Sequence, residues 1–168
     1  GVNNPFYYFM RAEGQSGKSH DDRWRWGVGK FVFPHASAIR SLFILTVRSD
    51  DNKRYLAGQS ILKSHRVEDK SYTPDGWFGD YEGKYDFQLP AEDGAIIDQF
   101  TADFRLARGH GDTGLSVLIP YTNSDLQISD IASKVVNEYF FPILRGELVV
   151  EVASAEECVV IDGLYLSG

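Results

Sequence analysis

Two glycines one residue apart, followed directly by a lysine, carry the clearest chemistry in this sequence. They are Gly27, Gly29 and Lys30, and an apolar run begins immediately afterwards at Phe31. Glycine leaves the main chain uncovered, so neighbouring N–H groups can converge on an anion, and the start of a helix adds positive partial charge. The pattern predicts a phosphate-binding turn that leads into a helix. The alternative is a plain glycine-rich turn with an exposed lysine.

A second phosphate motif lies upstream of this turn. Residues 12–19 read Ala-Glu-Gly-Gln-Ser-Gly-Lys-Ser, which is the Walker A pattern with alanine in place of the first glycine. In that interpretation Lys18 binds the β- and γ-phosphates and Ser19 binds magnesium. A P-loop must be followed by a helix, however, and residues 20–26 show no apolar periodicity. The context favours a lid over residues 14–26 instead of a P-loop.

These glycine motifs resemble the lid half of the GHKL superfamily of ATPases, which includes gyrase, MutL, MORC proteins, histidine kinases and the ninety-kilodalton heat-shock chaperone. In that superfamily a lid runs into a Gly-x-Gly turn that opens a helix, and a later Gly-Thr-x-Val/Ile segment closes the nucleotide site. The chain has both parts in this order, first Trp26-Gly27-Val28-Gly29-Lys30-Phe31 and then Gly114-Leu115-Ser116-Val117. The similarity is closest to large bacterial ATP-binding proteins related to that chaperone, whose helix continues Gly-Lys-Phe-Val-Phe-Pro-x-Ala-Ser. It covers residues 9–152, and residues 27–37 are its most specific stretch.

The resemblance implies a partial Bergerat-like fold and a parent protein that is an ATPase, with ATP and magnesium as cofactors of the intact protein. Neither is expected to bind tightly to this chain alone. The cofactor-binding residues that it implies are Gly27, Val28, Gly29, Lys30 and Phe31 of the turn, Lys18 of the lid, and Ser116. The partners that it implies are nucleotide, the remainder of the same ATPase domain and a second copy in a homodimer. A role in DNA transactions or phage defence follows only by analogy.

Two departures from the superfamily pattern limit this transfer. The Asn/Glu box that holds magnesium and activates water lies upstream of the lid in the superfamily, as does the Asp-x-Gly-x-Gly box that reads adenine, and neither occurs here. Because only ten residues precede Arg11, we interpret the chain as a fragment without catalytic residues and expect it to be inactive alone. Leu115 stands where the superfamily usually has the threonine near adenine. Either Ser116 substitutes for that threonine or the contact is absent.

The remaining candidates for chemistry are weaker. The histidines lack the close pairing or cysteine partners of a zinc site, so no metal site is expected. His110, Asp112 and Ser116 lie too close in sequence to have the separate supports of a hydrolase triad, so we expect His110 to be an exposed loop residue. Cys158 is the single cysteine, which excludes an intrachain disulfide, and its apolar surroundings predict a small buried side chain.

Composition and charge are those of an ordinary globular domain. A chain of 168 residues that is 43% hydrophobic and 14% aromatic can bury a sizeable core. A net charge of −7 argues against a general polyanion-binding surface. Basic residues nevertheless gather near the start, at Arg11, Lys18, Arg23, Arg25 and Lys30. With no signal-peptide pattern and no apolar run long enough to span a bilayer, we predict a cytoplasmic protein without membrane contact.

Periodicity predicts the elements that would position these residues. A hairpin is expected from strands over residues 41–48 and 54–67 around a polar turn at 49–53. Other strands are expected over 115–120, 147–153 and 157–162. Helices are expected over 29–40, 95–107 and 124–144, the last capped by Ser124 and ended or kinked at Pro142. Residues 68–93, rich in glycine and aromatic side chains, are expected to be a packed surface loop.

Together these elements predict an α+β two-layer sandwich, mostly antiparallel sheet with helices on one face, in a single domain over residues 1–168. The predicted function is the nucleotide-binding portion of a larger GHKL-type ATPase. The alternative from another class is a non-catalytic α/β protein-interaction module. In that reading the aromatic loop of residues 72–87 is the contact surface and the glycine turns are plain turns.

Overall fold

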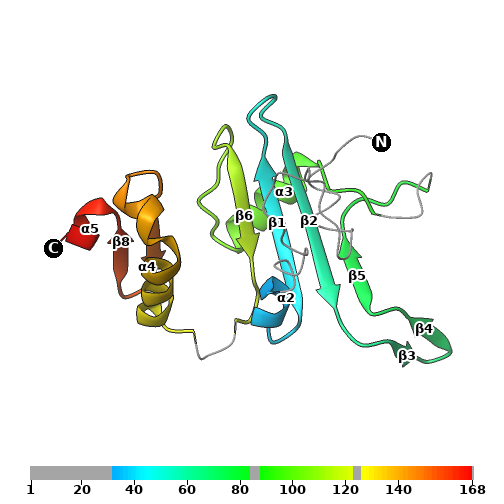
Figure 1. The fold of residues 1–168 in the computed structure, drawn as a ribbon. Coiled ribbons are helices and arrows are strands. Elements are labelled where there is room, and N and C mark those ends of the chain that lie inside the picture. Colours follow the sequence, from blue (N-terminus) through cyan, green and yellow to red (C-terminus); the bar gives the residue numbers. More distant parts are fainter. Residues whose placement is uncertain (1–31, 84–87, 123–125, 168) are drawn as a thin grey trace, which may run out of the picture. The chain divides into compact units, whose positions relative to one another are not determined.

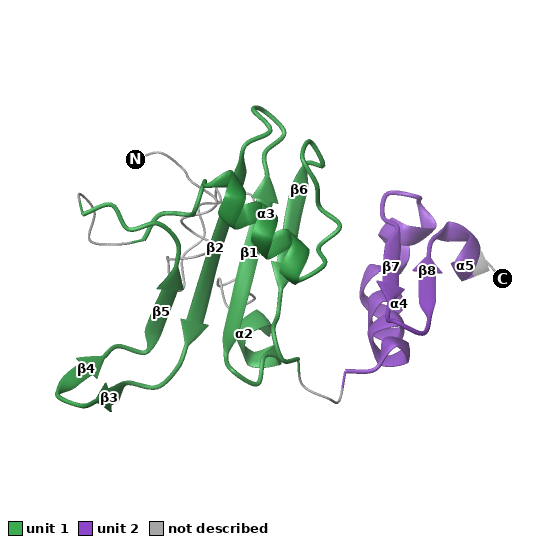
Figure 2. Ribbon diagram, turned by 180° about the vertical axis from the view of Figure 1, so that it is seen from behind, with its two compact units in different colours: residues 1–122 green, residues 123–168 purple. Residues whose placement is uncertain are grey.

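The computed structural model describes residues 32–83, 88–122 and 126–167 (Figure 1). It is an α+β structure whose packing divides the chain into two compact units, residues 1–122 and 123–168 (Figure 2). The single domain over residues 1–168 stays a prediction.

The first unit is built on a four-stranded antiparallel sheet with the order β5-β2-β1-β6. Its strands are β1 (Ser41–Val47), β2 (Arg54–Ile61), β5 (Asp75–Phe78) and β6 (Gly114–Leu118). β1 and β2 form the predicted hairpin, in a register that pairs Ser41 with Ser60 and Val47 with Arg54. The polar turn between them is also confirmed. Asn52 adopts a left-handed φ of 55° there, a conformation that asparagine tolerates better than most residues.

Residues 68–93 contain more regular structure than the sequence predicted. Instead of a loop, they include β4 (Lys70–Tyr72) and β5, and β5 extends the main sheet by pairing with β2. Gly58 helps to explain why β5 pairs with β2, because a Cβ at this position would lie 2.7 Å from the ring of Phe43. Since glycine has no Cβ, Phe43 and Phe78 can pack edge to face across β2 at a centroid distance of 5.6 Å. The expected strand over 54–67 breaks after Ile61, and β3 (His65–Val67) pairs with β4 in a separate hairpin.

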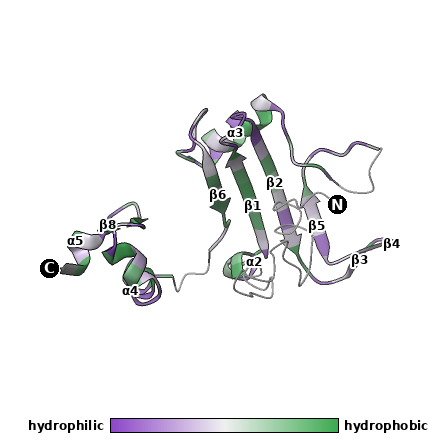
Figure 3. Cartoon of the chain, turned by 45° about the horizontal axis from the view of Figure 1, so that its top comes forward, coloured by the Kyte–Doolittle hydropathy of each residue, from purple (hydrophilic) through white to green (hydrophobic). Residues whose placement is uncertain are grey.

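Alternation along β1 gives the sheet two different faces. Leu45 packs with Leu56, Ala91 and Ile97 on the face covered by α3 (Gly94–Asp103). Leu42 and Ile44 point to the other face, which we call the α2 face because Phe33 of α2 (Val32–Ala36) packs against it. α2 therefore packs on the face opposite α3, a detail that the expectation of helices on one face did not include. Figure 3 shows the hydrophobic residues concentrated along β1, as a strand buried on both faces requires.

The helices of the first unit are shorter than their apolar patterns suggested. α2 ends at Ala36 instead of residue 40, and Arg40 adopts a left-handed φ of 54° just before β1. Asp93 caps α3 by accepting a hydrogen bond of 2.8 Å from the backbone N–H of Ala95. α3 ends before Arg105, whose φ of 51° closes the helix in the way that glycine usually does.

The second unit consists of α4 (Ile128–Leu144), a hairpin of β7 (Val150–Ala153) and β8 (Cys158–Ile161), and α5 (Gly163–Ser167). Ala132, Ile143, Val152 and Ile161 form its buried core. The α4 backbone departs from helical geometry at Tyr139, one residue after the carbonyl with which the Pro142 ring interferes, so the predicted kink is present. Gly146, at a φ of 71°, then ends the helix.

Two expectations for the second unit differ from the structure. α4 begins at Ile128, and Gln127 at its N-terminal boundary makes no side-chain capping bond; the expected cap Ser124 lies outside the described residues. Cys158 is exposed, not buried. Its strand alternates, with Val159 and Ile161 facing the core, so Cys158 points outward.

Within the described part of the chain, no helix combines the length and the apolar character needed to cross a membrane.

Candidate functional site

The predicted nucleotide site lies largely outside the part of the chain that the structure describes. Gly27, Val28, Gly29, Lys30, Phe31 and Lys18 all lie outside the described residues, as does the Walker-like segment of residues 12–19. Of the predicted site residues, Ser116 is the one that the structure describes. What the structure does show is how the elements that follow the glycine turn are joined.

The end of α2 is fastened to the end of β6. The Ser37 hydroxyl donates a hydrogen bond of 2.6 Å to the Pro120 carbonyl oxygen, and the Ala38 N–H donates one of 2.8 Å to the Tyr121 carbonyl. Ser37 is only 1% exposed. We call this contact the α2–β6 seam. It joins the segment that follows the Gly27 turn to the segment that follows Gly114, two regions that the sequence separates by about half its length.

Ser116 is held by a neighbouring arginine. It lies in β6 opposite Leu45, on the sheet face covered by α3, and its hydroxyl accepts a hydrogen bond of 2.8 Å from Arg108 Nε. Its neighbour Leu115 pairs with Thr46, so it points to the α2 face, where it is 54% exposed. Adjacent strand residues face opposite ways. The structure therefore brings Leu115, and not Ser116, onto the face where α2 packs.

Arg108 organises the loop that precedes β6. Its guanidinium donates hydrogen bonds of 2.8 and 3.0 Å to the carbonyls of Asp112 and Thr113, in addition to the bond to Ser116. Gly114, at a φ of 137°, leaves the space in which the guanidinium sits, because a Cβ there would lie 2.8 Å from Arg108 Nη1. Arg108 is thus engaged by the protein itself. The sequence did not indicate that an arginine would hold this loop.

A second polar cluster fastens α3 to the sheet. Arg54 of β2, with its side chain 8% exposed, donates a hydrogen bond of 2.6 Å to Asp98 of α3. His110 Nε2 lies 3.6 Å from the same carboxylate oxygen. The hydrogen bond from Arg54, with a smaller contribution from His110, holds the pKa of Asp98 below its ordinary value. His110 is exposed on its loop, as predicted, and the arrangement is that of an ion pair that supports the fold.

No carboxylate or histidine cluster suited to a metal ion was found in the part of the chain that the structure describes.

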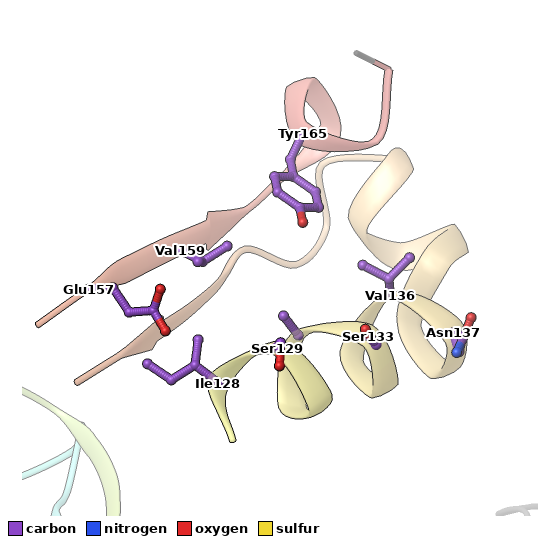
Figure 4. Close-up of a pocket in the computed structure, with 9 residues that line it drawn as sticks. Ile128, Ser129, Ser133, Val136, Asn137, Glu157, Val159 and Tyr165 are labelled. Carbon is purple, nitrogen blue, oxygen red and sulfur yellow. The ribbon is translucent and has the colours of Figure 1, made fainter. Parts of the chain in front are cut away.

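The second unit contains a cleft that sequence reasoning missed. Its volume is about 580 Å³, and it lies between α4 on one side and the β8 end and α5 on the other (Figure 4). The residues that line it are Ile128, Ser129, Ala132, Ser133, Val136, Asn137, Glu157, Val159 and Tyr165. The three polar residues of α4 recur every four positions, a spacing that could have been read as one helix face. What the sequence did not show is that the hairpin folds back beside that face.

No protein-family profile, no curated protein and no solved structure matches this chain.

Proposed function

We propose that this chain is the nucleotide-binding portion of a larger GHKL-type ATPase, with ATP and magnesium bound by the intact protein. The proposal begins from the Gly27-Val28-Gly29-Lys30 turn, whose spacing suits a phosphate. Lys18 and the lid around it are assigned to the same site. The chain alone lacks the upstream boxes of that superfamily, so it is expected not to hydrolyse ATP.

The observation that carries the proposal is the α2–β6 seam. In a site of this kind the turn after the lid and the later glycine-containing strand must converge, although they are far apart in sequence. The bonds from Ser37 to Pro120 and from Ala38 to Tyr121 fasten together the elements that follow these two motifs. An arrangement in which β6 lay at a distance from α2 would have contradicted the proposal.

Leu115 modifies the expected contact with the base. Since Leu115 points to the α2 face and Ser116 is engaged by Arg108, we assign Leu115 an apolar contact with the adenine ring in place of the superfamily's threonine hydroxyl. An exposed leucine can pack against a planar base but cannot form a hydrogen bond with it. The site would thus depend more on its phosphate contacts for affinity.

A titration with ATP and magnesium tests this function. It compares the 168-residue chain with the same chain carrying about 100 further upstream residues from its natural source, roughly the rest of a domain. The expected result is saturable binding to the longer protein, with amide shifts at residues 27–30 that Gly27→Ala abolishes. Gly109→Ala is the matched control, because a Cβ at Gly109 would meet no atom within 4 Å. ATP turnover by the short chain, or binding that Gly27→Ala leaves intact, would contradict the proposal.

The interaction module remains as the second candidate, on one observation. Tyr72, Phe78 and Tyr81 are exposed aromatic side chains in the region of residues 72–87, and Tyr81 is 66% exposed. Exposed aromatic residues are enriched at protein interfaces. This candidate would be favoured if the longer protein bound no nucleotide and if Tyr81→Ser removed the binding of a protein partner to the chain.

A further inference from the structure

Glu157 places a carboxylate on the inner side of the β7/β8 hairpin. Residues 157, 159 and 161 alternate onto the face that packs against α4. Ile161 is fully buried, Val159 is half-buried and Glu157 is exposed, so this face opens toward Glu157. Among the residues that the structure describes, no hydrogen bond or ion pair engages the Glu157 carboxylate. An acidic group is therefore free at the open end of the cleft.

The second unit is rich in acidic residues, and Glu157 is the one charged side chain among the residues that line the cleft. The acidic residues of positions 126–167 are Asp130, Glu138, Glu147, Glu151, Glu156, Glu157 and Asp162, against Lys134 and Arg145 as the basic ones. Neither basic residue lines the cleft. Such a field concentrates cations and repels anions. The cleft is thus unsuited to a phosphate or a nucleotide, and its occupant is distinct from the one assigned to the Gly27 turn.

The apolar lining of the cleft favours a cation that carries an apolar stem. Ile128, Ala132 and Val136 recur every four positions along α4 and give the cleft an apolar row. Figure 4 shows Ile128 and Val136 across the cleft from Val159 and Tyr165. A bare metal ion would place charge against this row without covering it, and a polyamine has no backbone amides to pair with the polar residues of α4. Lysine and arginine have apolar stems that cover such surface while the charged head stays at the rim. Ser129, Ser133 and Asn137 lie beside the apolar row and offer hydrogen-bonding groups to a peptide backbone.

We propose that this cleft binds a basic peptide segment, in which a lysine or arginine flanked by aliphatic residues pairs with Glu157. The aliphatic neighbours pack on the apolar row of α4 and on Val159. The volume of about 580 Å³ lies within the range of roughly 300–1,000 Å³ that is typical of ligand sites. The proposal does not depend on the nucleotide function of the first unit.

The test is an NMR titration of the 168-residue chain with the peptide acetyl-Val-Lys-Val-Lys-Val-amide. Saturable amide shifts are expected at cleft residues such as Ser129, Ser133 and Val159. The matched peptide acetyl-Val-Glu-Val-Glu-Val-amide is expected not to bind, and spermine is expected to cause weaker shifts, confined to the acidic end of the cleft. Glu157→Gln should weaken lysine-peptide binding about fivefold, the upper range of a solvent-exposed ion pair. Glu156→Gln removes the same charge one position away, outside the cleft lining, and should leave affinity unchanged.

Several results would overturn the proposal. One is an absence of cleft shifts at about 1 mM peptide, a concentration that detects even weak binding. Equal losses from Glu156→Gln and Glu157→Gln would mean that net charge alone attracts the peptide. Spermine binding with the affinity and shifts of the peptide would exclude the peptide as the specific occupant. Preserved amide dispersion in the Glu157→Gln spectrum verifies that the variant is folded.

Discussion

The Ser37 hydroxyl donates a hydrogen bond to the Pro120 carbonyl oxygen at 2.6 Å, across 83 positions of the sequence. The same hydroxyl oxygen accepts a bond of 3.3 Å from the Ile39 N–H. The hydroxyl of this buried serine therefore acts both as a hydrogen-bond donor and as an acceptor. The contact sets where the chain leaving α2 meets the chain leaving β6, so it controls the geometry on which the proposed nucleotide site depends.

Ser37→Ala is expected to destabilise the first unit by about 1–3 kcal/mol, because the half-buried Pro120 carbonyl loses its donor. The measurement is the free energy of unfolding from urea denaturation followed by tryptophan fluorescence, with two-state behaviour verified. Ser64→Ala, in the exposed segment between β2 and β3, is the control and should change stability by less than about 0.5 kcal/mol. Equal effects of the two substitutions would show that the seam contributes nothing specific.

The Arg108 guanidinium provides a second prediction. Arg108→Lys keeps the charge but loses the planar group that reaches the Asp112 and Thr113 carbonyls together, so we expect about 1–3 kcal/mol of destabilisation and faster amide exchange over residues 112–116. Gly114→Ala should have the same local effect, since the new Cβ would lie only 2.8 Å from Nη1 and the φ of 137° disfavours alanine. Gly109→Ala should leave exchange unchanged. Protection that persists in Arg108→Lys would show that the loop is held by its backbone alone.

The sequence predicted the β1/β2 hairpin, the strands β6, β7 and β8, and the helices α3 and α4, because each has a clear period and local stop signals. It missed β5, since the pairing of β5 with β2 depends on Gly58 leaving room for Phe43 and Phe78, a long-range packing relation. The helix predicted through residue 40 stops early because Ser37 has a tertiary partner in Pro120.

In the candidate site, too, local features could be predicted from the sequence and features that depend on long-range pairing could not. The spacing of the glycines could be read directly, but the face to which Ser116 points depends on the register of β6 against β1. A shift of one residue would have exchanged Ser116 and Leu115 between the faces. The cleft of the second unit could not be predicted from the sequence for a related reason: its lining combines residues of α4 with residues after the β7/β8 turn, which only the tertiary structure brings together.

The ion pair between Arg54 and Asp98 predicts a pH dependence. The folded-state pKa of Asp98 is depressed, so the pair contributes stability above the unfolded pKa of about 3.9, and this contribution is lost as pH falls through the folded-state value. Arg54→Met should return the Asp98 pKa toward its ordinary value, measured by carbon-13 NMR titration of the carboxylate. His110→Gln should cause a smaller rise, because His110 is the lesser cause. If the two variants raised the pKa equally, the hydrogen bond from Arg54 would not be the main one.

Cys158 gives the last prediction. Its thiol is exposed, but partial desolvation together with the nearby Glu151 carboxylate raises its pKa above the ordinary value. The thiolate is the reactive form, so Cys158 should react with 5,5′-dithiobis(2-nitrobenzoate) in the folded protein, more slowly near pH 8 than an unstructured cysteine peptide. Glu151→Gln removes the repulsion and should raise the rate and lower the pH midpoint of the reaction. Glu147→Gln, which changes net charge equally, should leave both unchanged. A thiol that reacts only after unfolding would contradict its position on the outer face of β8.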